Sequence, residues 1–406
     1  MRQPRKAGPV LAGACAVVLA VSLPGCVTGG GPAKAAPAAR TAGASAATAG
    51  TPEARGGRGD HARARTVARR TGRTVRVPWR ALAGADAVAV AGNAVWVANS
   101  DDEAHGGGGW LAEFDAATGK LIRIVAGRRY ALADPVALAV DGNSLWVADG
   151  NGDALTEINA TTGALIRVVA GQRYALADPA AIAAGGGDVW AASAGANSVT
   201  EIDAATGALV RVISAPRYRL NTTVYPPAIA VAGNRVWVAD GNAGALTEID
   251  ATTGALIRVI TARRYQLNGP DAIAVAGDRA WVVDVDSSAV TEIDAATGAL
   301  IRVIPSLPNV PFAIAADRAG AWLVTNLGVK AVDGSRPDGS VAELSAAAGR
   351  LVRNIGAPPF RSAVPGGAIA AGGGAVWVTG SDFYGYRHWL AELSAATGAL
   401  VRVIAG

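Results

Sequence analysis

The side chains best suited to metal binding or acid–base catalysis gather in two similar loops, residues 99–109 and 380–387, each followed closely by Trp-Leu-Ala-Glu. Beside the two histidines of these loops lie Asp101, Asp102, Glu103, Asp382, Tyr386 and Arg387. Histidine among oxygen ligands suits many divalent ions, so a cation site is one interpretation. No fixed ligand spacing is present, however, and we assign no metal, catalytic residue or cofactor. We expect these loops to bind a ligand through His105, Trp110, Tyr384, His388 and Trp389.

An Arg-Tyr pair occurs four times, at intervals close to the length of a repeated unit. Such cation-plus-aromatic pairs suit glycans or anionic ligands, and repeated loop packing in adjacent copies is the alternative explanation. The candidate ligand-binding pairs are Arg129-Tyr130, Arg173-Tyr174, Arg217-Tyr218 and Arg264-Tyr265.

Three aspartates, Asp149, Asp240 and Asp284, stand at equivalent positions just after a conspicuous tryptophan. We expect them to rim a central channel, although polar termination of a strand explains them equally well. The stretch from Asp149 to Asp153 has the opening spacing of a calcium loop but lacks the later glycine and the terminal glutamate.

The elements that position these residues belong to a sequence repeat that is present in seven copies. The clearest copy is at residues 227–260. Its tryptophans are separated by 50, 44, 47, 44, 41 and 55 residues, which is typical of a propeller. They are Trp96, Trp146, Trp190, Trp237, Trp281, Trp322 and Trp377. We predict an all-β fold over residues 74–406, a seven-bladed β-propeller of four-stranded antiparallel blades.

In the clearest unit the four strands, named a to d, cover residues 228–232, 235–240, 245–250 and 255–260. Strand a is alanine-rich and belongs nearest the axis, where blades crowd together, and the tryptophan of strand b should fill the space between blades. Strand c carries one glutamate and strand d one arginine, ten residues apart, in every unit. We expect a cross-strand ion pair such as Glu201 with Arg211, contributing about 0.2–1 kcal/mol.

The first and last blades are neighbours in a closed ring, so the two histidine loops should meet. The chain ends with a complete strand d, yet residues 72–77 also resemble a strand d. Whether this segment competes for that position or adds to the edge of the seventh blade is open from the sequence.

Residues 1–25 have a positive start and an apolar centre, which indicates a secretory signal peptide. Residues 23–26, Leu-Pro-Gly-Cys, resemble a bacterial lipobox, which implies that Cys26 is lipidated. Otherwise the protein is secreted. Residues 26–73 are rich in Ala, Gly and Pro and then in Arg, which favours a disordered tether.

Residues 1–80 carry a net charge of +12 and residues 81–406 a net of −7, so the high isoelectric point belongs to the tail. The absence of a basic folded region argues against nucleic acid as a partner.

The segments Val-Trp-Val-Ala-Asn (95–99) and Glu-Ile-Asp-Ala-Ala-Thr-Gly (201–207) resemble the YVTN-type and NHL-like β-propeller repeats of bacterial surface proteins. The streptogramin lyases are a related seven-bladed family. Asp-Ala-Ala-Thr-Gly also resembles quinoprotein repeats, but those continue to a tryptophan that is missing here. These motifs specify a fold and leave the function open.

We therefore expect an extracytoplasmic, monomeric binding scaffold that is held on the bacterial membrane by its lipid anchor and recognises an unidentified protein, glycan or peptide. The alternative is an enzyme similar to streptogramin lyases or lactonases, with a divalent metal on the loop face. The lyase family has catalytic histidines and a glutamate with magnesium. Blades two to six contain no histidine, so none of these residues carries over.

Overall fold

The computed structural model describes residues 73–406 except 101–107, 215, 221–226, 262, 306, 308, 327–338, 357–366 and 382–387. The expected signal peptide (1–25), Cys26 and nearly all of the expected tether (26–73) lie outside the described residues. In the described part, no helix is long and apolar enough to cross a membrane.

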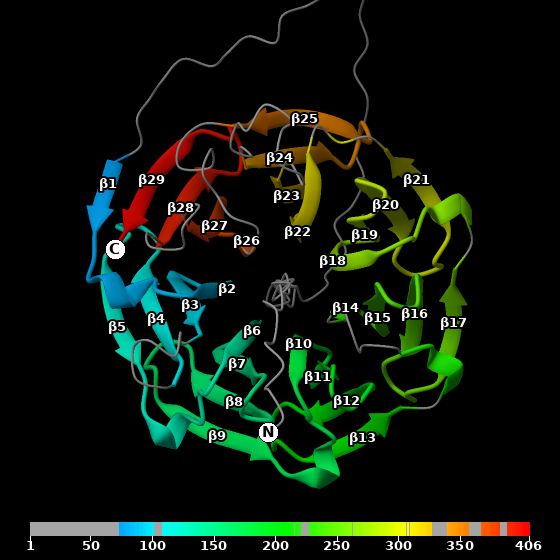
Figure 1. Cartoon of the computed structure of the whole chain (residues 1–406), viewed down its shortest axis with the longest axis horizontal. Coiled ribbons are helices and arrows are strands. Elements are labelled where there is room, and N and C mark those ends of the chain that lie inside the picture. Colours follow the sequence, from blue (N-terminus) through cyan, green and yellow to red (C-terminus); the bar gives the residue numbers. More distant parts are fainter. Residues whose placement is uncertain are drawn as a thin grey trace, which may run out of the picture. The chain divides into compact units, whose positions relative to one another are not determined.

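Seven antiparallel sheets form a ring of blades around a central axis (Figure 1), which confirms the predicted propeller. Blade one contains β2 (Ala85–Ala91), β3 (Ala94–Asn99), β4 (Trp110–Asp115) and β5 (Leu121–Val125). Blade two contains β6 (Pro135–Asp141), β7 (Ser144–Asp149), β8 (Ala154–Asn159) and β9 (Leu165–Ala170). Blade three contains β10 (Pro179–Gly185), β11 (Asp188–Ser193), β12 (Ser198–Asp203) and β13 (Leu209–Ile213).

The remaining blades repeat this order. Blade four contains β14 (Ala228–Ala232), β15 (Arg235–Asp240), β16 (Ala245–Asp250) and β17 (Leu256–Ile260). Blade five contains β18 (Pro270–Ala276), β19 (Arg279–Asp284), β20 (Ala289–Asp294) and β21 (Leu300–Ile304). Blade six contains β22 (Val310–Ala316), β23 (Gly320–Asn326), β24 (Ser340–Ser345) and β25 (Arg350–Ile355). Blade seven contains β26 (Ile369–Gly372), β27 (Ala375–Ser381), β28 (His388–Ser394) and β29 (Leu400–Ala405).

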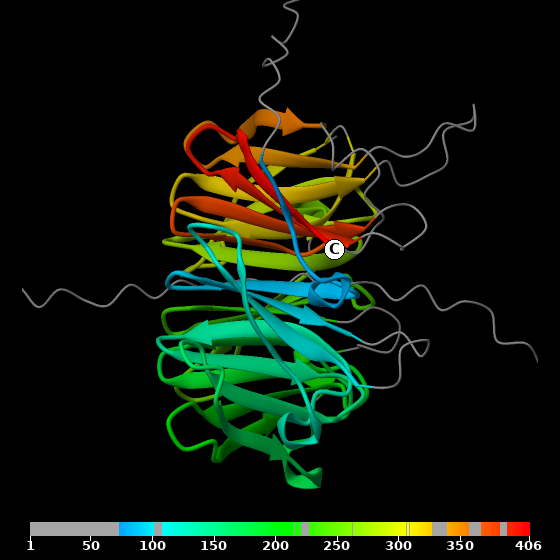
Figure 2. The same cartoon turned by 90° about the vertical axis from the view of Figure 1, so that its left-hand side faces the viewer.

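Short 3-10 turns lie between blades, on one face of the ring (Figure 2). They are η1 (Trp79–Ala81), η3 (Arg128–Tyr130), η4 (Gln172–Tyr174), η5 (Pro216–Tyr218) and η6 (Arg263–Tyr265).

The core repeats one line of residues across each blade. In blade three, Ala183 of strand a pairs with Trp190 of strand b, which pairs with Glu201 of strand c. All seven tryptophans are buried, and Trp96 donates its indole N–H to the carbonyl of Ala160 in the next blade at 3.2 Å. The alanine-rich strands a line the inside of the ring (Figure 1). The predictions for strand a and for the tryptophans between blades are confirmed.

The C-terminal strand completes blade seven, which settles the question of ring closure that the sequence left open. Strand d of blade seven is the C-terminal β29, so that blade is complete without help from the N-terminal side. The segment that resembles another strand d forms β1 (Arg73–Arg76) and adds to β29 as a parallel fifth strand. β2 packs against the short β26 and against β27 across the junction of blades one and seven.

Candidate functional site

In each blade the repeated glutamate of strand c and arginine of strand d form an ion pair, which we name the clasp. It has a structural role and is not a binding site. Glu201 pairs with Arg211 in register, as predicted, and Oε2 lies 2.8 Å from Nε. The equivalent ion pair is present in all seven blades. Glu201 is only 2% exposed, and this burial raises the pKa of its carboxyl to about 7 against the opposing effect of Arg211.

Each clasp also reaches the neighbouring blade, a contact that the sequence did not predict. Arg211 of blade three donates to the carbonyl of Thr252 at 3.0 Å, in the turn between strands c and d of blade four. We name this Asp-x-x-Thr-Gly segment the c–d turn. Its glycine, Gly254, has φ +69° and lies against the Arg211 side chain. The clasp therefore joins blades as well as strands.

In each Arg-Tyr pair the tyrosine is buried and the arginine is exposed. Tyr174 is 5% exposed and donates its hydroxyl to the carbonyl of Gly207, in the c–d turn of the next blade, at 3.2 Å. Arg173 is exposed, with its guanidinium 4.7 Å from the Tyr174 ring centre. The three other pairs repeat this arrangement. The tyrosines hold blades together, which leaves the arginines as the half that a ligand can reach.

The three aspartates expected to rim the channel are buried rather than exposed at a rim. Asp149, Asp240 and Asp284 are each 0% exposed. Asp149 accepts backbone N–H groups from Asp134 at 3.0 Å and Gly152 at 2.6 Å. Burial raises the pKa of the Asp149 carboxyl, whereas these N–H groups lower it. These carboxylates satisfy loop backbone that would otherwise be buried without partners.

Of the residues predicted from the two histidine loops, His105 and Tyr384 lie outside the described residues, so the meeting of the loops stays a prediction. Trp110 pairs in register with Asn99 of β3. Its indole N–H is buried and has no acceptor within the described part.

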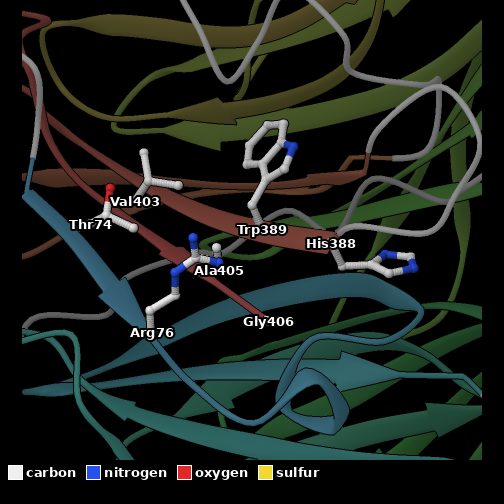
Figure 3. A pocket seen from close by; sticks show the side chains of 7 residues that line it. All are labelled: Thr74, Arg76, His388, Trp389, Val403, Ala405 and Gly406. Atoms are coloured by element: carbon white, nitrogen blue, oxygen red, sulfur yellow. The ribbon is translucent and has the colours of Figure 1, made fainter.

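His388 and Trp389 begin β28 and line a pocket of about 480 Å³ at the outer end of blade seven (Figure 3). We name it the seam pocket. Its lining comes from three adjacent strands and comprises Thr74, Arg76, His388, Trp389, Val403, Ala405 and Gly406. The Arg76 side chain extends from β1 toward β29, so the strand that precedes the ring contributes one wall.

Local sequence explains how Trp389 is seated. It pairs in register with Gly380 of β27, and a Cβ on Gly380 would lie 2.3 Å from the indole. Only glycine fits there. The pocket thus combines an exposed guanidinium, an imidazole, an indole and the aliphatic surface of Val403 and Ala405. This set can bind a carboxylate beside an apolar side chain.

Sequence reasoning missed Thr74 and Arg76 as lining residues. The signal was the strand-like pattern of residues 72–77, which we related to ring closure alone. It also missed Asp86 and Asp134, on adjacent blades. Burial raises the pKa of the Asp86 carboxyl to about 6, and the charge of Asp134 adds to the shift. In the described part of the chain, no three His, Cys, Asp or Glu side chains are placed to hold a metal ion.

A family profile described as outer membrane protein assembly factor BamB matches residues 60–303, which is 244 of the 406 residues. No curated protein matches the sequence significantly.

Several solved structures share the fold. Virginiamycin B lyase from Staphylococcus aureus is 16% identical with a TM-score of 0.56, over 73% of this chain and 91% of that chain. The computationally designed Ika8 protein is 17% identical with a TM-score of 0.56, over 79% and 87%. The WD40 repeats of RRP9 are 11% identical with a TM-score of 0.55, over 72% and 86%. The resemblance to bacterial β-propeller repeats is thereby confirmed, and because the profile covers more than half of the sequence, the chain belongs to the BamB family of β-propellers.

Proposed function

We propose that this protein is an extracytoplasmic, lipid-anchored binding scaffold that holds a segment of another protein at the seam pocket. The signal-like residues 1–25 and the lipobox-like Cys26 support the location. The family profile supports it as well, because its description names an assembly factor of the outer membrane. The arginines of the proposed tether would add to membrane binding, because each contributes about 1 kcal/mol of attraction near an anionic lipid surface.

The observation that carries the proposal is the composition of the seam pocket. Arg76 offers planar donors for a carboxylate, and Trp389 with Val403 offers apolar surface. Peptide segments present both kinds of group within a few residues. Between the blades, by contrast, the clasps and the four buried tyrosines make their contacts within the ring.

Site-specific photo-crosslinking in intact cells tests the proposal. A photoreactive amino acid replaces His388 in the full chain, and a control replaces Asn143, which is exposed in the turn between β6 and β7. We expect a discrete protein adduct from position 388 that weakens at least fivefold when Arg76 is changed to Ser. Equal labelling at both positions, or no loss on Arg76→Ser, would reject the seam pocket as the site.

The anchor has its own test. Labelled palmitate should enter the wild-type chain and not Cys26→Ser, and globomycin should leave a larger precursor. An unchanged size with no incorporated label would show that the protein is secreted rather than anchored.

A lyase-like enzyme is the second candidate, favoured by the shared fold with virginiamycin B lyase. It predicts a stoichiometric divalent ion and a turnover that is lost on His105→Ala or His388→Ala. A purified domain with turnover that both substitutions leave unchanged would contradict this candidate.

A further inference from the structure

The fifth strand of blade seven differs from every other strand in the ring. β1 is four residues long and pairs in parallel with β29, whereas the strands within the blades pair antiparallel. Three of its four residues are exposed. Blade seven already has strands a to d without it, so β1 is an addition to a finished sheet.

The register of β1 includes one unfavourable pair of side chains. Arg73 lies opposite Arg402, and like charges directly opposite each other on a sheet are unfavourable. The favourable part is small: Val75 and Val77 pack against the core of blades one and seven, and the Val77 N–H donates to the Ala405 carbonyl at 3.1 Å. Main-chain bonds of this kind do not depend on the side chains of the added strand.

The connection that follows β1 explains why this strand lies at the outer edge of β29. β1, η1 and β2 succeed one another in the same order as a strand d, a 3-10 turn and a strand a elsewhere in the ring. Thr-Val-Arg-Val at 74–77 follows the strand d pattern of Leu-Ile-Arg-Val at 300–303. Because β29 occupies the position of strand d, β1 takes the next place outward.

We propose that the outer edge of β29 is a strand-addition site for an extended segment of a partner protein, and that β1 is its displaceable resident. The incoming segment runs parallel to β29, places a β-branched side chain where Val75 lies, and carries an acidic residue opposite Arg402. The incoming segment takes the place of β1 and of the pocket wall that Thr74 and Arg76 form. Strand addition is therefore a second way of binding at the seam that goes beyond the proposed function, in which Arg76 holds the ligand while β1 stays in place.

A reversible lock on β1 gives the test. Thr74 and Val403 are register partners and line the same pocket, so Thr74→Cys with Val403→Cys should form a disulfide between β1 and β29. The full chain also carries Cys15→Ser and Cys26→Ser, because these are its only natural cysteines. The probe is a fluorescent peptide with the sequence of residues 71–79. A second variant, Val75→Pro, frees the edge without any disulfide, since proline cannot donate to the ladder.

We expect the peptide to bind Val75→Pro and the reduced lock variant, and to bind the oxidised lock at least tenfold more weakly. A peptide with Arg73→Glu should bind about two- to fivefold more tightly, because it replaces a like-charge pair opposite Arg402. A peptide with Val75→Pro should not bind. Tight binding to the oxidised lock, or no binding to either opened form, would overturn the inference.

Two further outcomes are informative. If Val75→Pro converts the protein into a dimer through exchanged β1 strands, the edge serves a second copy and the proposed occupant is wrong. If the peptide binds as expected while crosslinking at position 388 finds no partner, the strand-addition site stands and the proposed function fails.

Discussion

Gly119, in the c–d turn of blade one, lies against Arg402 of blade seven: a Cβ on Gly119 would be 2.8 Å from the Cδ atom of Arg402. Arg402 also pairs with Glu392 at 2.5 Å. The same arginine-on-glycine contact joins each of the other blade pairs, for example Arg167 with Gly207. The ring therefore closes by the contact that also links its other blades, and β1 is not required for closure.

The first prediction concerns this contact. Gly119→Ala should lower the free energy of unfolding by about 2–4 kcal/mol, because a left-handed backbone and overpacking against Arg402 both add strain. Gly142→Ala is the matched control, since Gly142 has φ +55° with nothing within 4 Å of a Cβ. It should cost about 1 kcal/mol. Equal losses in chemical denaturation would show that Arg402 does not close the ring.

The second prediction separates the two halves of an Arg-Tyr pair. Tyr174→Phe should destabilise the fold by about 1–2 kcal/mol, because it removes the bond to the Gly207 carbonyl in the next blade. Arg173→Ala should change stability by less than about 0.5 kcal/mol, since its side chain is exposed. Denaturation curves measure both. If Arg173→Ala proved the more damaging, the guanidinium and not the hydroxyl would hold the blades.

The third prediction concerns pH. Burial raises the pKa of the Asp271 carboxyl to about 6 from its ordinary 3.8, with Asp286 and Asp284 adding to the shift. Between these values the folded state binds more protons than the unfolded chain, so stability falls as the pH rises from about 4 to above 6. Asp271→Asn should therefore stabilise the protein by about 1–3 kcal/mol at pH 7.5 and have little effect near pH 4.

Asp294→Asn is the control of opposite sign. The Thr297 hydroxyl and backbone N–H bond to Asp294 and lower the pKa of its carboxyl. This substitution should destabilise the fold at pH 7.5. A loss of stability with Asp271→Asn at that pH would contradict the assigned shift.

The sequence predicted the blades and the ion pairs because both repeat with a fixed period. Glu201 and Arg211 are ten residues apart across a five-residue turn, and such spacing determines their register. It did not reveal that Arg211 also bonds Thr252, since this contact depends on how two blades pack. For the same reason Asp149 was expected at an exposed rim: a carboxylate at a strand end looks the same in the sequence whether it faces solvent or buried backbone N–H groups.

The sequence predicted only part of the lining of the seam pocket. His388 and Trp389 stood out because they break the repeat, whereas Arg76 lies more than 300 residues away in sequence and reaches them only through the parallel pairing of β1 with β29. The pattern of residues 72–77 indicates a strand but does not identify its partner, because the partner depends on which strand already occupies position d.

Hydrogen–deuterium exchange of the native full chain tests most directly the central claim, that the ring is closed without β1 and that β1 is a removable strand at the seam. We predict that the amides of Val75 and Val77 exchange at least tenfold faster than the paired amides of β28 and β29, because local opening releases β1 alone. Exchange of the β1 amides as slow as that of β28 and β29 would contradict the account, since β1 would then be an integral part of the ring.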